Sequence, residues 1–377
     1  MLPVSPRPRI SLVVHDFSEG FGQGRYCTEL VSRLGDRFEF SVVSASFCSS
    51  ARPSVKWYPV NSWRRGALST ILTFLVRGPA EVRRSVPDLI HSQGMTCWGA
   101  DLVTAHVCNA ARKTQLDADH FRARWFSRII TPLEHAFYRQ QKLCRVIGIS
   151  RIVASEIRDH YGWRGMMDVV HHGTDVDRFR PAQMDESSKM RRQLGLSESA
   201  WIWLFMGEAN KGLAEVLDQM PLFPEARLVV VSRSDLAPFR ANAQRLGVAG
   251  RIVFHGPEKA PERLHRIADV FIYPSRYDTF GLVVTEAMAS GVPVVVGRNI
   301  GAAELIEDGR NGLLCDPTDA PSITRAIRSL ATDRTSARAI GREGRRTVER
   351  HTWAECAEAT ARVYDQVLAA KRTRFHR

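Results

Sequence analysis

Short apolar runs alternate with longer amphipathic stretches along almost the whole chain, and this alternation limits the possible folds more than any other feature. Repeated strand–helix units of this kind predict parallel β-sheets covered by helices. In the first half, the expected strands are Arg9–Val14, Glu39–Val43, Asp88–His91, Asp101–Ala105 and Arg145–Ile149. The expected helices lie around residues 24–34, 67–85, 123–143 and 151–161.

A second set of strands follows the polar segment 181–200, which we interpret as a linker. Its members are Trp201–Met206, Arg227–Val231, Arg251–Phe254, Val270–Tyr273, Val292–Val296 and Gly312–Leu314. Several are apolar throughout, as is typical of strands that are covered on both faces. The length of 377 residues allows two domains, each with its own core. The sequence therefore predicts an α/β fold with two Rossmann-like, doubly wound parallel sheets, which bind ligands at the carboxyl ends of their strands and face a cleft.

The composition is that of an ordinary globular protein, with 44% apolar and 25% charged residues. The longest apolar run, Ala67–Val76, is about half the length that a membrane-spanning helix needs. The N-terminal segment has no apolar core of signal-peptide length. No two of the seven cysteines have metal-ligand spacing, so we expect reduced cysteines and a cytoplasmic location.

The net charge is +13, and most of the excess positive charge lies in the first 170 residues. A basic half indicates an anionic partner such as phosphates, a membrane surface or nucleic acid, although simple solubility explains it equally well. A nucleic-acid-binding protein would show clustered aromatic residues on a basic sheet, or a recognition helix. Neither pattern is visible, so we expect no nucleic-acid partner.

The segment 274–297, PSRYDTFGLVVTEAMASGVPVVVG, is the strongest indication of function. A strand ends at Tyr273, a Pro-Ser turn follows, and a helix is expected to begin near Phe280–Gly281. Within residues 279–297, Glu286 is the only charged residue. A carboxylate in such an apolar run is costly to bury without partners. The structural alternative is an exposed glutamate on one face of the helix.

Asp278 comes just before this helix, at a position that suits an ordinary N-cap. In the functional interpretation, Asp278 and Glu286 both lie beside the helix N-terminus. Free backbone N–H groups there favour phosphate oxygens, and carboxylates accept hydrogen bonds from sugar hydroxyls. A polyol that carries a diphosphate is a ligand that uses both.

This segment resembles the family 4 glycosyltransferases, which are retaining enzymes with the glycosyltransferase-B (GT-B) fold. Their hallmark is a pair of acids in the context P-S-x-x-E-x-F-G-L-x-x-x-E-A-M-A-x-G-x-P-V-V, and here Asp278 and Glu286 stand in the two acid positions. The resemblance implies that Glu286 holds the ribose hydroxyls of a nucleotide and that Asp278 lies beside the donor sugar. It also assigns Phe280, Gly281 and Leu282 to donor binding. The family pattern has glutamate in the first acid position, so the side chain of Asp278 is shorter by one methylene group.

The resemblance extends over nearly the whole chain. It implies an acceptor domain at 1–175, a donor domain at 176–352, and a last helix at about 353–377 that crosses back to the first domain. It further implies that His255 and Pro257 lie near the nucleotide base. The other matching segments are VVHHGTDVDRFRP (169–181), RIVFHGP (251–257), AAELIEDGRNGLLCDP (302–317) and HTWAECAEATARVYDQVL (351–368).

A glycine-rich turn, EGFGQGRY, follows the first strand, where Gly22 and Gly24 would let the backbone approach a phosphate or a sugar. A dehydrogenase is the obvious rival interpretation. However, Arg25 stands where the third glycine of a dinucleotide-binding turn belongs, and the second strand ends without the acid that binds a nicotinamide ribose. Both departures argue against a nicotinamide cofactor.

A second loop, MGEANKGL, follows the first strand of the second set. By resemblance, Gly207 and Lys211 belong to a loop that grips the diphosphate, with Glu208 in the place of an expected arginine. Arg233 or Arg25 could supply the missing cation. A surface lysine before a turn glycine is the alternative interpretation of Lys211.

His106 follows the strand DLVTA and resembles the first-domain histidine that contacts the donor sugar in this family. A histidine at the end of a strand can equally be structural. No residue stands out as a covalent nucleophile, and no Asp-x-Asp motif is present. We therefore expect a retaining transfer from a nucleoside diphosphate sugar (UDP- or GDP-linked), by front-face attack and without a metal or other cofactor.

Residues 61–84 and 121–145 are basic and also rich in aromatic or aliphatic residues. Such segments suit interfacial helices on an anionic membrane, and they equally suit ordinary amphipathic helices. The first interpretation predicts a peripheral protein with an envelope glycan or lipid-linked acceptor, as in lipopolysaccharide or exopolysaccharide biosynthesis. Two alternatives remain: a phosphorylase or sugar-phosphate synthase of the same fold, and a non-catalytic, partner-dependent subunit.

Overall fold

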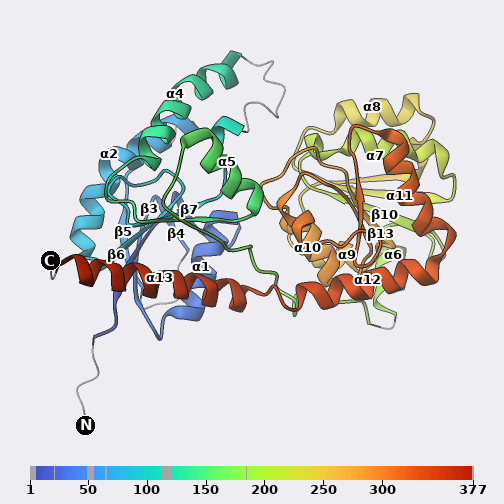
Figure 1. Cartoon of the computed structure of the whole chain (residues 1–377). Helices are drawn as coiled ribbons and strands as arrows, with labels where there is room; N and C mark the ends of the chain where they lie inside the picture. Colours follow the sequence, from blue (N-terminus) through green and yellow to red (C-terminus); the bar gives the residue numbers. More distant parts are fainter. Residues whose placement is uncertain are drawn as a thin grey trace, which may run out of the picture. The chain divides into compact units, whose positions relative to one another are not determined.

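The computed structural model describes residues 6–20, 22–48, 55–63, 66–111, 121–183 and 185–375. The chain forms two compact units (Figure 1). Unit 1 consists of Met1–His172 together with Trp353–Arg377, and unit 2 consists of Gly173–Thr352. Each unit is built on a parallel sheet with helices packed against it, so the predicted α/β class with two doubly wound sheets is confirmed.

The main sheet of unit 1 has seven parallel strands in the order β5-β3-β1-β6-β7-β8-β9. In chain order these are β1 Arg9–Val13, β3 Glu39–Ser44, β5 Lys56–Pro59, β6 Leu89–Gln93, β7 Leu102–Ala105, β8 Arg145–Gly148 and β9 Met166–Val169. Two short strands, β2 Asp16–Phe17 and β4 Ser46–Phe47, pair separately. The five strands expected here are present. The additional strands β5 and β9 are short and mostly exposed, so no buried apolar run marks them in the sequence.

The four helices expected in this part of the chain are also present. They are α1 Gly22–Leu34, α2 Ala67–Ser85, α4 Phe121–Tyr138 and α5 Arg151–Tyr161. Within the described residues, no helix is both long enough and apolar enough to cross a membrane.

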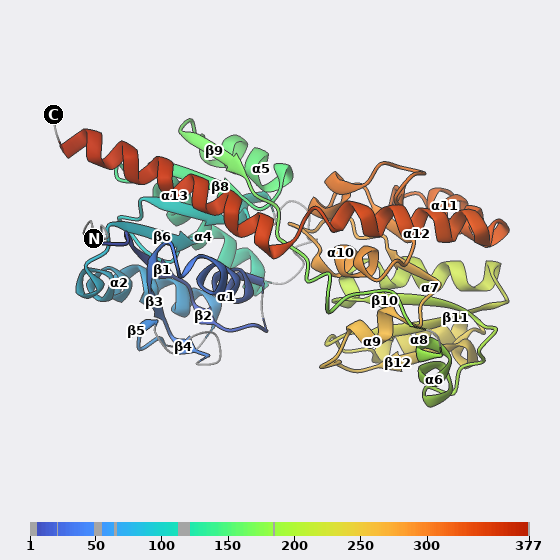
Figure 2. The same ribbon diagram turned by 90° about the horizontal axis from the view of Figure 1, so that it is seen from below.

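The last helix, α13 Trp353–Phe375, packs on unit 1 and lies along its sheet in both views (Figures 1 and 2). Hydroxyl groups join its buried face to the unit: Tyr26 and Thr360 share a hydrogen bond of 3.0 Å, and Tyr364 lies 2.7 Å from Nδ1 of His91. Towards its end, Lys371 Nζ donates to Asp101 at 2.9 Å. The predicted return of the last helix to the first half of the chain is therefore confirmed.

Unit 2 contains six parallel strands in the order β12-β11-β10-β13-β14-β15. Their bounds are β10 Trp201–Met206, β11 Ala226–Val231, β12 Ile252–His255, β13 Val270–Tyr273, β14 Val294–Gly297 and β15 Leu313–Cys315. The α-helices are α6 Glu186–Gln193, α7 Leu213–Gln219, α8 Ala237–Arg245, α9 Glu262–His265, α10 Leu282–Ala289, α11 Ala320–Thr332 and α12 Arg334–Val348. Short 3₁₀ helices lie at η2 Ala209–Lys211, η3 Met220–Leu222, η4 Ala249–Arg251 and η5 Gly301–Leu305.

The interpretation of residues 181–200 as a linker is wrong, because this segment contains α6 and is anchored to the core of unit 2. Arg191 is buried and donates hydrogen bonds to the carbonyl oxygens of Ile267, Glu198 and Ala200. Its guanidinium also pairs with the Asp269 carboxylate at 3.0 Å. A buried arginine with this many acceptors stabilises the segment, although its sequence is strongly polar.

His265 on α9 predicts how the stability of unit 2 depends on pH. Its ring is fully buried between Phe179 and Phe271, and neither ring nitrogen has a hydrogen-bond partner among the described residues. Burial lowers the pKa of His265 to about 3, from an ordinary value of 6.5. Below pH 6.5 the unfolded chain binds a proton at His265, whereas the folded protein does not bind it until the pH approaches 3. The free energy of unfolding is therefore highest above pH 6.5 and decreases as the pH falls towards 3.

We expect His265→Leu to raise the melting temperature by a few degrees, because it removes a buried, unsatisfied polar ring at similar volume. The gain should be larger at about pH 5 than at about pH 8, since only the wild type loses stability on acidification. Thermal unfolding at both pH values measures it, with the exposed His160→Leu as the control. A gain of equal size at both pH values would contradict the titration argument.

Candidate active site

Two loops meet at the carboxyl edge of the unit 2 sheet, because β10 and β13 are neighbouring parallel strands. The first loop, residues 207–212, follows β10, and the second, residues 274–281, follows β13. Gly212 has φ +104°, and a Cβ atom there would lie 2.6 Å from the carbonyl oxygen of Pro274. The two loops therefore pack so closely that this position requires glycine.

Lys211 and Asp278 meet where these loops touch. The Lys211 ammonium donates to the carbonyl oxygen of Tyr277 at 2.7 Å and lies 3.4 Å from Oδ2 of Asp278. Both side chains keep about a fifth of their surface exposed, 22% for Lys211 and 19% for Asp278. A ligand can therefore reach a cation and a carboxylate that the fold has already brought together.

Tyr273, the last residue of β13, is a member of this group that the sequence analysis did not single out. Its hydroxyl donates to Oδ2 of Asp278 at 2.8 Å. Burial, and then the negative charge of Asp278, raises the pKa of Tyr273 well above its ordinary value, so the phenol keeps its proton. The sequence does carry a signal for this residue. Tyr273 is the only hydroxyl-bearing residue of the strand VFIY, and it lies five positions before Asp278.

The start of α10 is held by backbone contacts to the first residues of η5. Gly301 N–H donates to the carbonyl oxygen of Asp278 at 3.1 Å, and Ala302 N–H donates to that of Phe280 at 2.7 Å. Gly281 has φ +91°, a left-handed conformation that favours glycine, and Leu282 is the first residue of the helix. The Phe280 N–H donates to Oδ1 of Asp278 at 3.4 Å, so the turn places backbone N–H groups beside this carboxylate.

Glu286 lies one turn into α10 and is only 9% exposed. Val284, Ala287 and Met288 on the same helix are completely buried. The helix is buried over most of its length, and the alternative of an exposed glutamate is wrong. The fold therefore holds this carboxylate largely out of solvent, four residues after the start of the helix.

The loop after β10 brings further charges to the same edge. Gly207 has φ +145°, and a Cβ atom there would lie 3.1 Å from the Tyr273 ring. Glu208 accepts a hydrogen bond of 2.7 Å from the Ser234 hydroxyl, and Nε of Arg233 lies 3.9 Å from its other oxygen. Glu208 stands where the family pattern has an arginine. Arg233 is therefore the candidate in this unit to supply the missing positive charge.

His255 and Pro257 lie at the end of the edge strand β12. Nδ1 of His255 is 2.8 Å from the carbonyl oxygen of Gly256, and its Nε2 is 3.7 Å from Glu258. Among the described contacts, none joins His255 to the Lys211–Asp278 group. Two strands, β11 and β10, separate β12 from β13 along this edge.

His106 belongs to unit 1 and is 7% exposed. Its Nε2 lies 2.9 Å from the amide oxygen of Gln93, which can only accept, so Nε2 carries the proton and Nδ1 is left as an acceptor. Burial lowers the pKa of His106 well below 6.5, and the neighbouring His172 and His91 lower it further. His106 is therefore a neutral hydrogen-bonding group and not a cation.

Gly22 and Gly24 differ sharply in their surroundings at the start of α1. A Cβ atom on Gly24 would lie 2.4 Å from the carbonyl oxygen of Ser18 and 2.7 Å from that of Asp16, whereas one on Gly22 would meet nothing within 4 Å. We expect Gly24→Ala to lower stability by about 1–3 kcal/mol, because backbone atoms must move to admit the methyl group. Gly22→Ala is the matched control, and both are compared by thermal unfolding. Equal melting temperatures would contradict the close approach of α1 to this turn.

Within the described residues, no group of histidine, cysteine, aspartate or glutamate side chains is arranged to hold a metal ion.

Comparison with known proteins identifies the family. The chain is 30% identical to the D-inositol 3-phosphate glycosyltransferase of Streptomyces avermitilis, over 94% of this chain and 84% of that protein. Residues 22–178 match the family described as Glycosyltransferase Family 4, and residues 186–347 match Glycosyl transferases group 1. The chain belongs to the group 1, family 4 type of glycosyltransferases. The resemblance seen in the sequence is confirmed, and the protein is a transferase.

Solved structures confirm the GT-B fold of this glycosyltransferase. Sucrose-phosphate synthase from Thermosynechococcus elongatus superposes with a TM-score of 0.81 at 22% identity, covering 97% of this chain and all of that chain. Anabaena HepE in complex with UDP-glucose superposes with a TM-score of 0.76 at 17% identity, covering 96% of this chain and all of that chain. At these identities the likeness extends to the fold only.

Proposed function

We propose that this glycosyltransferase moves a sugar from a nucleoside diphosphate sugar to an acceptor hydroxyl with retention of the anomeric configuration. The observation that carries the proposal is the contact between Lys211 and Asp278 at the start of α10. Where the loops after β10 and β13 meet, the fold brings together a cation suited to a diphosphate, a carboxylate suited to sugar hydroxyls and the start of a helix. A nucleotide sugar uses all three, and a relative of the same fold is described in complex with UDP-glucose.

In this proposal each residue contacts one part of the donor. Lys211 neutralises the diphosphate, and the loop at Gly207 lets the backbone approach it. Glu286 accepts hydrogen bonds from the ribose hydroxyls. Asp278, held by Tyr273, orients the donor sugar. The remaining assignments follow the family pattern: Phe280, Gly281 and Leu282 line the donor, His255 and Pro257 lie by the base, and His106, Gly22 and Gly24 act from the first domain.

The proposed reaction needs no covalent intermediate. The acceptor hydroxyl oxygen forms a bond to the anomeric carbon on the face from which the diphosphate leaves, and its proton passes to a leaving phosphate oxygen. Negative charge grows on the diphosphate as the glycosidic bond breaks, and Lys211 stabilises that charge. The other residues contribute by holding the donor in position.

The test is a panel of UDP- and GDP-sugars, screened by thermal shift and by release of the nucleoside diphosphate, with Glu286→Ala in parallel. We expect one donor to raise the melting temperature and to be turned over, and both effects to disappear in the variant. Product analysis distinguishes retention from inversion. A folded protein that binds no donor would contradict the proposal and favour a partner-dependent subunit; release that depends on inorganic phosphate would favour a phosphorylase.

We further propose that the acceptor is an envelope glycan or a lipid-linked sugar at an anionic membrane. Two exposed apolar pairs support this: Leu72 and Val76 on α2, and Trp125 and Ile129 on α4. Each pair is spaced to lie on one helix face, and basic residues lie nearby in the sequence. Arg64 and Arg65 lie outside the described residues, as do the side chains of Arg122 and Arg124.

We expect the protein to float with anionic vesicles at low salt and to be released as salt is added, because basic side chains near the surface contribute about 1 kcal/mol each. Val76→Ser, at a side chain that is 78% exposed, should weaken flotation without lowering the melting temperature. Leu222→Ser, at an exposed apolar residue of unit 2, is the control. Equal flotation with neutral and anionic vesicles, or none, would contradict the membrane proposal.

A further inference from the structure

A cavity of about 510 Å³ lies at the amino-terminal edge of the unit 2 sheet, opposite the edge that carries Lys211 and Asp278. Trp201, the first residue of β10, lines it, as does Asp269, the residue before β13. Pro293, the residue before β14, closes one side. Since all strands of this sheet are parallel, the cavity and the candidate active site are at opposite ends of the same strands.

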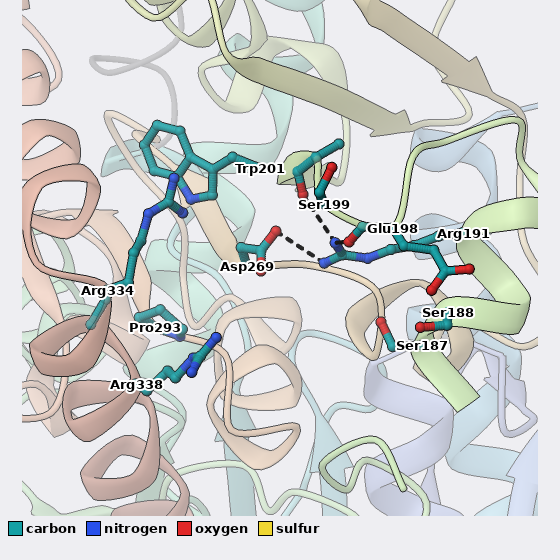
Figure 3. Close-up of a pocket in the computed structure, with 12 residues that line it drawn as sticks. Ser187, Ser188, Arg191, Glu198, Ser199, Trp201, Asp269, Pro293, Arg334 and Arg338 are labelled. Atoms are coloured by element: carbon teal, nitrogen blue, oxygen red, sulfur yellow. Dashed lines mark hydrogen bonds and ion pairs between the residues drawn. The ribbon is translucent and has the colours of Figure 1, made fainter. Parts of the chain in front are cut away.

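Two arginines on α12 point into this cavity, as Figure 3 shows. Arg334 and Arg338 are four residues apart and so share one face of the helix. The Arg334 guanidinium lies 4.1 Å over the centre of the Trp201 ring. Among the described residues, no carboxylate lies within 4 Å of either guanidinium, although the charges of Asp269 and Glu225 act on Arg334 from a greater distance. Two like charges are therefore held near each other with no carboxylate in direct contact.

The opposite wall of the cavity is held by hydrogen bonds of Arg191 and Asp269. Arg191 approaches from α6 with its hydrogen bonds used by backbone carbonyl oxygens and by Asp269, so it shapes the wall (Figure 3). Asp269, which lines the cavity, accepts hydrogen bonds through Oδ2 from Arg191 and from the Ile202 N–H, so both of these contacts leave Oδ1 able to accept another. Ser187, Ser188 and Ser199 add hydroxyl groups. The lining thus combines two guanidinium groups with serine hydroxyls and with the carboxylates of Asp269 and Glu198, which are themselves paired with Arg191 and Arg192.

We propose that this cavity is a second ligand site, which binds a small phosphate ester of a polyol, such as a sugar phosphate. The phosphate lies between Arg334 and Arg338, whose planar guanidinium groups match phosphate oxygens in pairs. The polyol hydroxyls donate to Oδ1 of Asp269 and bond to the serine hydroxyls. The cavity volume of about 510 Å³ is large enough for a hexose phosphate. This inference does not rest on the donor site proposed above.

Titration calorimetry of the full chain with glucose 6-phosphate tests the site, with glucose and inorganic phosphate as comparison probes. We expect the ester to bind more tightly than either probe, because it uses both halves of the cavity. Arg338→Gln should weaken binding about 10- to 100-fold, as expected for the loss of one charge-assisted contact. Arg338 has no hydrogen bond or ion pair among the described residues, so this variant should fold normally. Arg334→Gln should act in the same direction.

Two controls separate the site from other binding. Arg328→Gln removes an exposed arginine from the neighbouring helix α11 and should leave binding unchanged. Lys211→Ala should also leave it unchanged, because Lys211 lies at the other edge of the sheet. Binding that is lost in Lys211→Ala and kept in Arg338→Gln would overturn the proposal and assign the ester to the active site. Equal affinity for inorganic phosphate and the ester, or no binding at millimolar ester, would also overturn it.

Discussion

Replacement of Lys211 by alanine is expected to lower kcat about 100- to 1,000-fold, the usual cost of removing one group that stabilises transition-state charge. The ammonium lies 3.4 Å from Asp278 and donates to the Tyr277 carbonyl oxygen, so the fold holds a positive charge beside the carboxylate that is assigned to the donor sugar. Release of nucleoside diphosphate at saturating donor measures the effect. Because the charge is needed most as the diphosphate leaves, kcat should fall more than donor affinity.

Two variants make this prediction specific. Lys211→Arg keeps the charge and should recover part of the activity, whereas Lys189→Ala removes an exposed lysine from α6 of the same unit and should have no effect. Melting temperatures measured in parallel separate a catalytic loss from a folding defect, since Lys211 also bonds to the backbone. Near-normal turnover by a folded Lys211→Ala variant would show that Lys211 does not stabilise the leaving diphosphate.

Glu286→Gln is expected to weaken donor binding about 10- to 100-fold, because a charged acceptor of ribose hydroxyls becomes a neutral amide of the same size. The side chain is 9% exposed within α10, so its contribution is little screened by solvent. Calorimetry should show the same loss for the bare nucleoside diphosphate as for the nucleotide sugar, since the ribose is common to both.

Asp278→Asn is the matched comparison for Glu286→Gln. It should weaken binding of the nucleotide sugar while leaving the nucleoside diphosphate almost unaffected, because Asp278 is assigned to the sugar. A donor that lacks the ribose hydroxyls adds a second check, since it should bind wild type and Glu286→Gln equally. If the variant still weakens binding of that donor, Glu286 does not act through the ribose.

The sequence predicted the elements whose signal is local. The apolar runs of β10, β11, β13 and β14 are buried over most or all of their length, and such runs are visible without knowledge of their neighbours. The start of α10 was also predicted well, because a turn, a left-handed glycine and an apolar helix follow one another directly. Features that depend on a few consecutive residues were therefore accessible.

The contacts between distant segments were less accessible. Lys211 and Asp278 touch because β10 lies next to β13, and that order is a property of the whole sheet. Only family resemblance assigned both to one site, and it did not reveal the hydrogen bond from Tyr273 to Asp278. Residues 181–200 were misinterpreted for a similar reason: the acceptors that make it favourable to bury Arg191 come from residues as far away as Ile267 and Asp269.

The position of α13 has a consequence for how the protein is made. Unit 2 is inserted between two parts of unit 1, and its own ends are joined by a bridge between Thr174 and Thr352. During synthesis, all of unit 2 leaves the ribosome before the helix that completes unit 1. Until α13 arrives, the buried face around Tyr26 and His91 has no cover from Thr360 and Tyr364. Unit 1, most of which is translated first, can therefore be completed only after all of unit 2 has been synthesised.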